Sequence, residues 1–204
     1  MTDRKSLIFV HIQKTGGSSI AAAIGQQVLS PHKHRFANEL KAIYGEDKWD
    51  SAYKFAFVRN PWDRLVSWWT MIETYRPKDS QQPALNNFFS YVYSNAQNFE
   101  EFIVNCKEDI EDNNGWKCIY RNQIDYLTDD SGGLMVDFIG KFENLMDDFN
   151  HVLTAAGWET RPLGHHNWTR HRPYQEYYTP RTRAIIEEAY ARDIAAFGYR
   201  FEEA

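Results

Sequence analysis

The sequence predicts an α/β fold built around a parallel sheet, because short apolar runs alternate with stretches of helical periodicity along its 204 residues. The first apolar run, residues 7–10, has four consecutive apolar residues, which is typical of a strand buried on both faces. A second run at residues 55–58 leads into a helical pattern in the same way. Because parallel strands end at a common edge, the loops that follow these two strands are expected to open on one crevice.

The remaining elements follow from the same patterns. Strands are expected at 7–11, 53–58 and 134–142, and a short strand or loop around His34. Residues 76–83 are polar and bracketed by prolines, which predicts a surface loop. Helices are expected at 18–29, 37–45, 61–75, 86–94, 99–107, 118–127, 143–156 and 180–196. A chain of this length supports one good core, so residues 1–204 are expected to form a single domain.

The loop after the first strand, residues 14–19, has the composition of an anion cradle. Its two glycines allow close approach of the backbone to a ligand, and the helix that follows favours negative charge at its start. Lys14 adds a full positive charge. A Walker loop has its lysine after the glycines, whereas Lys14 precedes Gly16, which indicates a different transfer chemistry. The plain alternative is a strand-to-helix turn with a solvated lysine.

The second strand leads into a well-specified helix start. Asn60 is a good N-cap, Pro61 suits the first helical position, and Asp63 lies in the first turn, where a carboxylate is favoured. Arg59 falls at the end of the strand, and Ser67 lies about two helical turns further on. A guanidinium group and a hydroxyl at these positions can both reach one phosphate at the edge of the sheet.

These two segments, HIQKTGGSSI at 11–20 and FVRNPWDRLVSWW at 57–69, resemble the cofactor motifs of sulfotransferases that use 3'-phosphoadenosine 5'-phosphosulfate (PAPS). The likeness is to the carbohydrate enzymes similar to heparan sulfate 2-O- and 6-O-sulfotransferases. Softer matches at 137–149, 177–180 and 197–201 extend it over most of the chain. The resemblance implies a three-layer sandwich with a central parallel sheet, of the P-loop NTPase-like sulfotransferase kind. It also implies transfer of a sulfuryl group to a hydroxyl acceptor, a carbohydrate.

The resemblance assigns roles to individual residues. Arg59 and Ser67 would hold the 3'-phosphate. The 5'-phosphosulfate would be held by Lys14, Thr15, Gly16, Gly17, Ser18 and Ser19. As the sulfuryl group leaves, charge builds on the bridging oxygen, and a lysine already placed there stabilises it without reorganisation. Positioning and charge stabilisation then supply most of the rate, and no metal is needed.

The acceptor hydroxyl must lose a proton, which calls for a base. His34 lies in a segment similar to the one where the family has a histidine before a short helix facing the acceptor, so it is the expected base. His32 is the nearest competitor, and Glu39 is a candidate to orient the imidazole. The alternative is a pair of surface histidines in a polar loop.

Residues 161–183 are rich in arginine, histidine and aromatic residues. By position this stretch resembles the late family loop that closes over the cofactor, which implies that Arg170 or Arg172 helps hold the 3'-phosphate and that Trp168 lines the pocket. A solvated arginine loop whose aromatic side chains pack in the core explains the composition equally well. A zinc site built from His165, His166 and His171 is disfavoured, because the spacing fits no familiar ligand frame.

Charge and hydropathy limit the partners. The net charge of −5 argues against a nucleic acid partner. No apolar run is long enough to cross a bilayer, and the N-terminus lacks the apolar core of a signal peptide, so a cytoplasmic enzyme is expected. Its eukaryotic relatives are typically anchored in the Golgi membrane, and this difference leaves the acceptor open.

Cys106 and Cys118 are expected as free thiols, with a disulfide between them as the alternative.

Two other classes of function remain open. A nucleotide or small-molecule kinase is disfavoured by the order of lysine and glycine and by the lack of an obvious magnesium-binding aspartate after a strand. The other class is a glycan- or nucleotide-binding protein that keeps the anion-binding loop at residues 14–19 but catalyses no transfer. In such a protein His34 would accept no proton. The oligomeric state is not readable from the sequence.

Overall fold

The computed structural model describes residues 4–26, 32–79, 82–112, 115–164 and 171–202. The chain divides into two compact units, each made of two separate segments. The first unit comprises Met1–Arg59 and Gln123–Trp168, and the second comprises Asn60–Asn122 and Thr169–Ala204. The second cofactor-like motif is therefore divided after Arg59.

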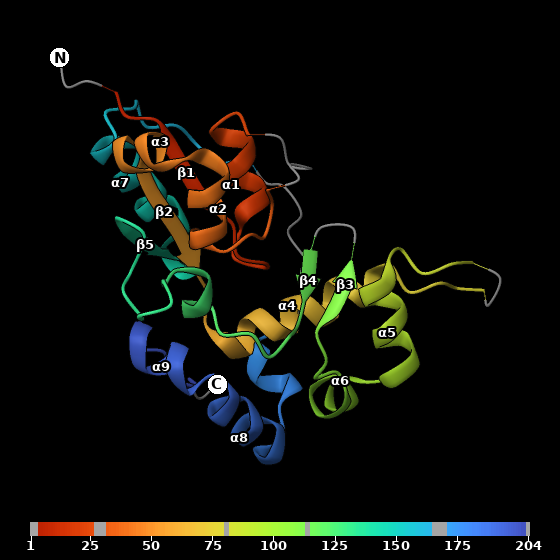
Figure 1. Ribbon diagram of the computed structural model, residues 1–204. Helices are drawn as coiled ribbons and strands as arrows, with labels where there is room; N and C mark the ends of the chain where they lie inside the picture. Colours follow the sequence, from red (N-terminus) through yellow and green to blue (C-terminus); the bar gives the residue numbers. More distant parts are fainter. Residues whose placement is uncertain (1–3, 27–31, 80–81, 113–114, 165–170, 203–204) are drawn as a thin grey trace. The chain divides into compact units, whose positions relative to one another are not determined.

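The first unit contains a parallel three-stranded sheet (Figure 1). Its strands are β1 (Leu7–Val10), β2 (Tyr53–Val58) and β5 (Phe138–Lys141), and β2 lies in the middle. Phe9 pairs with Phe55 across the first two strands, and Phe57 pairs with Gly140 across the next two. This arrangement confirms the predicted α/β class with a parallel sheet, and it confirms the first two strands.

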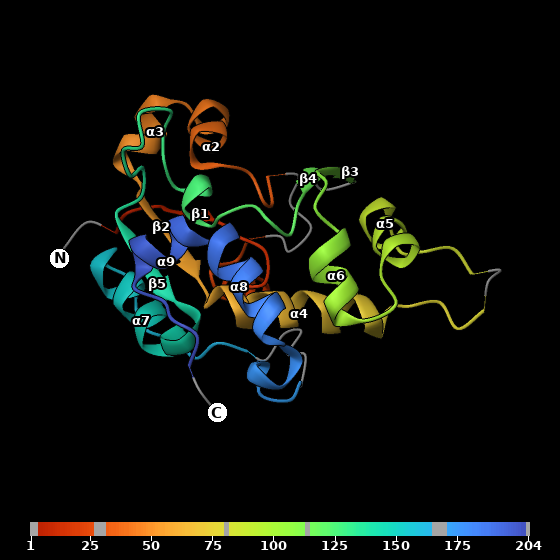
Figure 2. The same cartoon turned by 90° about the horizontal axis from the view of Figure 1, so that it is seen from below.

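The sheet of the first unit is buried on both faces. Phe9, Phe55 and Phe57 point to one face, where they pack with Ile20 of α1 (Gly17–Ala23) and Phe149 of α7 (Leu145–Ala155). The alternate side chains of the same strands are also buried: Ile8, Val10, Ala56 and Val58. Helix α7 lies alongside β5 (Figures 1 and 2). The continuous apolar runs in the sequence are therefore explained by burial of these strands on both faces of the sheet, as expected.

The first unit is completed by α2 (Ala37–Tyr44), α3 (Glu46–Ser51) and two single 3-10 turns, Ile124–Tyr126 and Phe142–Asn144. Helix α1 is shorter than predicted: its last helical residue is Ala23, and Gly25 follows with a φ of 74°. A glycine in this left-handed conformation is a common helix terminator. Helix α3 has six residues, and the sequence patterns predict no element there.

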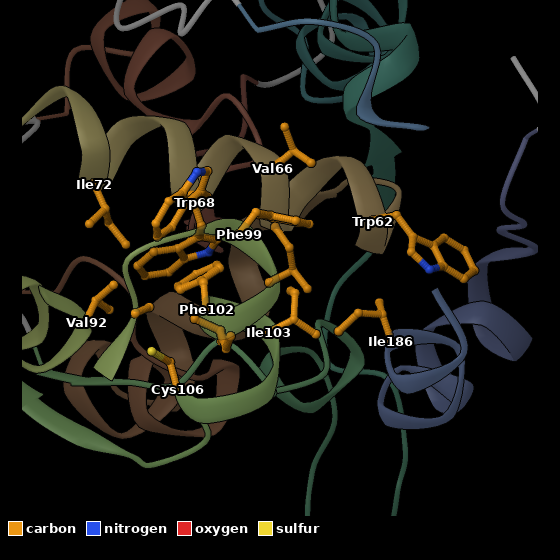
Figure 3. Close-up of a cluster of buried hydrophobic side chains, with 14 of the residues drawn as sticks. Trp62, Val66, Trp68, Ile72, Val92, Phe99, Phe102, Ile103, Cys106 and Ile186 are labelled. Atoms are coloured by element: carbon orange, nitrogen blue, oxygen red, sulfur yellow. The ribbon is translucent and has the colours of Figure 1, made fainter. Parts of the chain in front are cut away.

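The second unit is mostly helical. It contains α4 (Pro61–Thr74), α5 (Asn87–Asn95), α6 (Phe99–Asn105), the antiparallel hairpin β3 (Ile110–Asp112) and β4 (Gly115–Lys117), a 3-10 turn at Tyr174–Tyr177, α8 (Pro180–Ala189) and α9 (Ala191–Phe197). Its core gathers large apolar side chains from α4, α5, α6 and α8 (Figure 3). Trp62, Phe99 and Phe102 are among them.

The helix predicted at 118–127 is wrong. Within this span only Ile124–Tyr126 makes a helical turn, and the β3–β4 hairpin lies just before the span. The polar groups of this segment bond to other elements: the Tyr120 hydroxyl donates to the Ile103 carbonyl, and the Asn122 amide donates to the Ala189 carbonyl at 2.9 Å. These long-range bonds outweigh the local helical pattern.

Two other boundaries differ from the prediction. The predicted final helix at 180–196 is broken into α8 and α9 at Tyr190, which is fully buried and whose hydroxyl accepts from Arg64 at 3.2 Å. The strand predicted at 134–142 begins only at Phe138. Its earlier part makes a single bridge between Thr128 and Leu134.

Both cysteines are buried free thiols, which confirms the expected state of the pair. Burial raises the pKa of the Cys106 thiol to about 12. Burial also raises the pKa of Cys118, whose thiol contacts the Lys107 carbonyl at 3.4 Å.

Among the helices that the structure describes, none combines the length and apolar character required to cross a membrane.

Candidate active site

The loop at residues 14–19 turns sharply between β1 and α1. Lys14 and Gly16 both adopt positive φ angles, 67° and 81°. The Thr15 hydroxyl is buried and donates to the Ile12 carbonyl at 2.9 Å, and the Gly16 carbonyl accepts from the Ser19 amide at 3.1 Å. These two bonds fix the conformation of the loop. The Lys14 side chain is half-buried.

Each glycine of this loop has a close neighbour, and the φ of 81° at Gly16 also favours glycine. A Cβ atom on Gly16 would come within 3.0 Å of Leu145 and 3.3 Å of Phe142. A Cβ atom on Gly17 would lie only 2.0 Å from Nε2 of His11. The imidazole of His11, directly after β1, therefore lies against the first residue of α1. Only glycine fits between them without a shift of one or the other.

Arg59 is held at the end of β2 by side chains and backbone of the same unit. The buried Gln123 side chain accepts from the Arg59 amide at 2.9 Å and donates to the Arg59 carbonyl at 2.8 Å. The guanidinium lies over the Phe142 ring, 4.1 Å from its centre, and its Nη1 donates to the Lys14 carbonyl at 3.2 Å. The structure thus brings the first loop and the end of the second strand into direct contact.

The electrostatics of this region depend on a group of cations. The pKa of Lys14 is lowered from 10.5 to about 7, first by burial and then by the positive charges of Arg59 and Lys33. A lysine in this state is partly neutral near pH 7 and regains its full charge when an anion binds beside it. The region is therefore suited to a negatively charged ligand.

The two candidate bases face different neighbours. The His34 ring contacts the His11 ring edge-on at 4.8 Å, while the His32 ring contacts Tyr44 on α2 at 6.0 Å. His34 also has a positive φ of 65°. The Glu39 carboxylate accepts from the Phe36 amide at 2.8 Å and from Arg35 at 3.0 Å. Its role in orienting the imidazole of His34 stays a prediction.

The His11 imidazole is neutral. Burial, followed by the charge of Lys33, lowers its pKa from 6.5 to about 3. Its ring also stacks on Phe9, with centres 5.1 Å apart. It is therefore a packed, uncharged ring that joins the end of β1 to the turn that carries His34.

In the second unit, α4 begins as the sequence predicts. The Asn60 side chain accepts from the Trp62 amide at 3.1 Å, and Pro61 occupies the first helical position. Ser67 is buried on this helix, with 4% of its surface exposed. The other motif residues anchor the helix: Trp62 donates to the Arg183 carbonyl at 3.3 Å, and the buried Arg64 donates to the Arg121 carbonyl at 3.4 Å.

The basic-aromatic stretch is described only in part. Trp168 and Arg170 lie outside the described residues, as do His165 and His166. Arg172 is exposed, pairs with Glu176 at 3.2 Å and lies 5.1 Å from the Tyr177 ring centre. His171 contacts the Asp63 carboxylate at 3.6 Å. In the described part of the chain, no three or more His, Cys, Asp or Glu side chains gather as a metal site would require.

Sequence reasoning missed three residues of this region. His11 has a visible signal, since it directly follows a buried strand at the carboxyl edge of the sheet. Phe142 follows the third strand in the same way. Gln123 has no such signal, because it lies in a segment whose pattern is helical and because its partner Arg59 is 64 residues away.

Comparison with known families decides the class of this region. A profile described as the sulfotransferase family matches residues 1–200. The chain belongs to the sulfotransferase family. No curated protein and no solved structure gives a significant match. As a member of this family the protein is a transferase that acts on sulfuryl groups, with a sulfonate donor and a hydroxyl acceptor. The mixed α/β fold with its parallel sheet is consistent with this family.

Proposed function

We propose that the protein transfers a sulfuryl group from PAPS to a hydroxyl of a carbohydrate by in-line displacement, with His34 as the base. The observation that carries the proposal is the contact between the Arg59 guanidinium and the Lys14 carbonyl at 3.2 Å. It joins the two segments that resemble PAPS motifs and gathers their cations at the ends of β1 and β2. A donor with a charged group at each end requires such cations.

In this proposal Lys14 has two tasks. It binds the 5'-phosphosulfate together with Thr15, Gly16, Gly17, Ser18 and Ser19, and it stabilises the charge that develops on the bridging oxygen. Its pKa of about 7 means that the ammonium form is recovered when a dianion binds next to it. Because lysine supplies this charge, the proposed reaction requires no metal ion.

The donor's 3'-phosphate is assigned to Arg59 and Ser67. Two contacts support the role of Arg59. The two hydrogen bonds between its backbone and the Gln123 side chain fix the backbone, and stacking on Phe142 fixes the guanidinium before a ligand arrives. Trp168, Arg170 and Arg172 are assigned to the same end of the donor on the resemblance alone. The proposal also treats residues 1–204 as one sulfotransferase domain of a cytoplasmic enzyme.

His34 is the proposed base because its ring, unlike that of His32, contacts the end of β1 through His11. A base at this point can accept the proton of an acceptor hydroxyl as the sulfuryl group arrives. The acceptor is proposed to be a carbohydrate because the resemblance is to carbohydrate enzymes.

Calorimetry with adenosine 3',5'-bisphosphate tests the donor. We expect the bisphosphate to bind without magnesium, and we expect ATP to bind more weakly. Arg59→Ala should weaken bisphosphate binding by about tenfold or more, since a charged hydrogen bond is lost. Arg181→Ala, at a highly exposed position, is the matched control and should bind as the wild type does. Preferential binding of ATP with magnesium would instead support the kinase alternative.

Transfer assays with radiolabelled PAPS and a panel of glycans test the base. His34→Ala should lose transfer by about 100-fold or more while its affinity for the bisphosphate stays unchanged. His32→Ala is the control and should retain most activity. If the wild type binds the bisphosphate but transfers to no hydroxyl acceptor, the non-catalytic binding protein becomes the better reading. Unchanged transfer by His34→Ala would remove this residue from the mechanism.

A further inference from the structure

We infer that Lys33 is a third anion-binding cation of the active site, and that it acts with Lys14 and Arg59 on the sulfate or phosphate group at the reacting end of the donor. The inference rests on the proposed function for the identity of the anion. It adds a residue that neither cofactor-like motif contains, since Lys33 lies between His32 and His34, outside both.

The first step is the position of the turn that carries Lys33. The neighbouring His34 ring contacts the His11 ring at 4.8 Å, and Nε2 of His11 lies against Gly17 of the first loop. The Glu39 carboxylate fixes the far side of the turn by accepting from the Phe36 amide. The turn is therefore held against the loop that contains Lys14, and Lys33 lies at its centre.

The second step is the charge at this point. Lys33 is half-buried, and its charge acts on both Lys14 and His11, lowering the pKa of each. Arg59 acts on Lys14 in the same direction. The charges that act on Lys14 are thus those of Arg59, at the end of β2, and Lys33, on the turn. Lys33 also acts on His11 at the end of β1, whose ring contacts that of His34 on the turn. Arg35, which follows the turn, pairs with Glu39.

The third step is the chemistry that such a group serves. Positive charges that repel each other raise the free energy of the protein without ligand, and a bound dianion removes that repulsion. Lys33 can contact an oxygen of the anion that Lys14 and Arg59 do not reach, because it approaches from a different element. Binding must then be coupled to proton uptake, since Lys14 is about half neutral at pH 7 and becomes charged beside the anion.

The pKa of Lys14 gives a test that needs no nucleotide. Competitive acetylation across a pH series, read by mass spectrometry, measures it directly. In Lys33→Met the pKa of Lys14 should rise above the wild-type value, because one repelling charge is removed, but it should stay well below 10.5, because burial and Arg59 still lower it. Lys33→Arg should keep the wild-type value, and Lys5→Met, at an exposed position of the same unit, is the neutral control. An unchanged pKa in Lys33→Met would overturn the inference.

Ligand binding gives the second test. Calorimetry with adenosine 3',5'-bisphosphate and with inorganic sulfate, in two buffers of different ionisation enthalpy, reports both affinity and proton uptake. Lys33→Met should bind each ligand about tenfold more weakly and take up fewer protons at pH 8, while Lys33→Arg restores both. If Lys33→Met binds both ligands as Lys5→Met does, Lys33 is not an anion ligand. Loss of bisphosphate binding in the wild type, with sulfate binding and the Lys14 pKa as expected, would refute the proposed donor but not the role of Lys33.

Discussion

Two residues proposed for the chemistry have an unusual backbone conformation. Lys14 and His34 are the non-glycine residues with positive φ in the described part of the chain, at 67° and 65°. A side chain in the left-handed region costs about 1–2 kcal/mol, so the surrounding contacts must hold it there. The bond from Arg59 to the Lys14 carbonyl and the ring contact of His34 with His11 are such contacts. Nothing in the local sequence indicates this conformation.

The contact between His11 and Gly17 gives a prediction at the scale of single residues. Gly17→Ala places a methyl group 2.0 Å from Nε2 of His11, which neither the ring nor the helix can accept without moving. We expect a loss of about 1–3 kcal/mol in the free energy of unfolding, measured by urea denaturation.

A double-mutant cycle provides the control for this prediction. His11→Ala removes the ring, so Gly17→Ala should cost much less in the His11→Ala background than alone. Equal costs in the two backgrounds would show that the ring does not determine the need for glycine at this position. The cost would then come from the helix start itself.

At the scale of elements, the N-terminus of α4 has a cap with two functions. The Asn60 side chain accepts from the Trp62 amide at 3.1 Å and donates to the Arg200 carbonyl at 3.0 Å. It therefore starts the helix and ties it to the C-terminal segment of the same unit. Among the described residues, the Asn86 side chain of α5 has the first function alone, accepting from the Phe89 amide at 2.9 Å.

Substitution of these two caps separates the functions. Asn86→Ala should cost about 1 kcal/mol, the usual value for a lost cap, whereas Asn60→Ala should cost about 1 kcal/mol more. Asn60→Asp keeps the accepting oxygen and loses the donor, so its stability should lie between those of the wild type and Asn60→Ala. The free energy of unfolding in urea, measured for all three variants, checks the order. Equal losses at the two caps would refute the tie to Arg200.

At the scale of the whole molecule, buried His11 makes stability depend on pH. Its pKa is lowered from 6.5 to about 3, so between these values the unfolded chain binds a proton that the folded protein does not. The free energy of unfolding must therefore fall as the pH falls through this window. Between pH 7 and 4.5 this one group should account for about 2 kcal/mol of lost stability.

The contribution of His11 is found by comparing urea denaturation at the two pH values. Carboxyl groups also titrate on acidification, so the wild type alone is not sufficient. His11→Asn should lose less stability than the wild type over this interval, because it has no group to protonate on unfolding. His151→Asn, at an exposed position, should follow the wild type. If His11→Asn is as sensitive to acid as the wild type, the imidazole is not buried as described.

Lys14 acts in the same direction at higher pH. Its pKa is lowered from 10.5 to about 7, so the unfolded chain again binds more protons between these values. Stability should rise with pH through this range as the half-buried Lys14 ammonium loses its proton. A bound anion should remove this dependence, because it restores the charged form in the folded state.

By itself the sequence determined the parallel strands β1 and β2 and the start of α4. It did so because apolar runs, helical spacing and capping residues act through near neighbours in the chain. The residues of the first loop and Arg59 were found for the same reason. Their roles with the donor remain proposals.

Only the tertiary structure decided how these parts meet. Gln123 bonds to Arg59 across 64 residues, the turn at His34 packs on His11, and Tyr120 and Asn122 bond to the Ile103 and Ala189 carbonyls where a helix was expected. Each of these depends on groups far apart in the sequence that compete with local preferences. Such bonds become favourable only once the units have folded and water is excluded, so no local pattern could have predicted them.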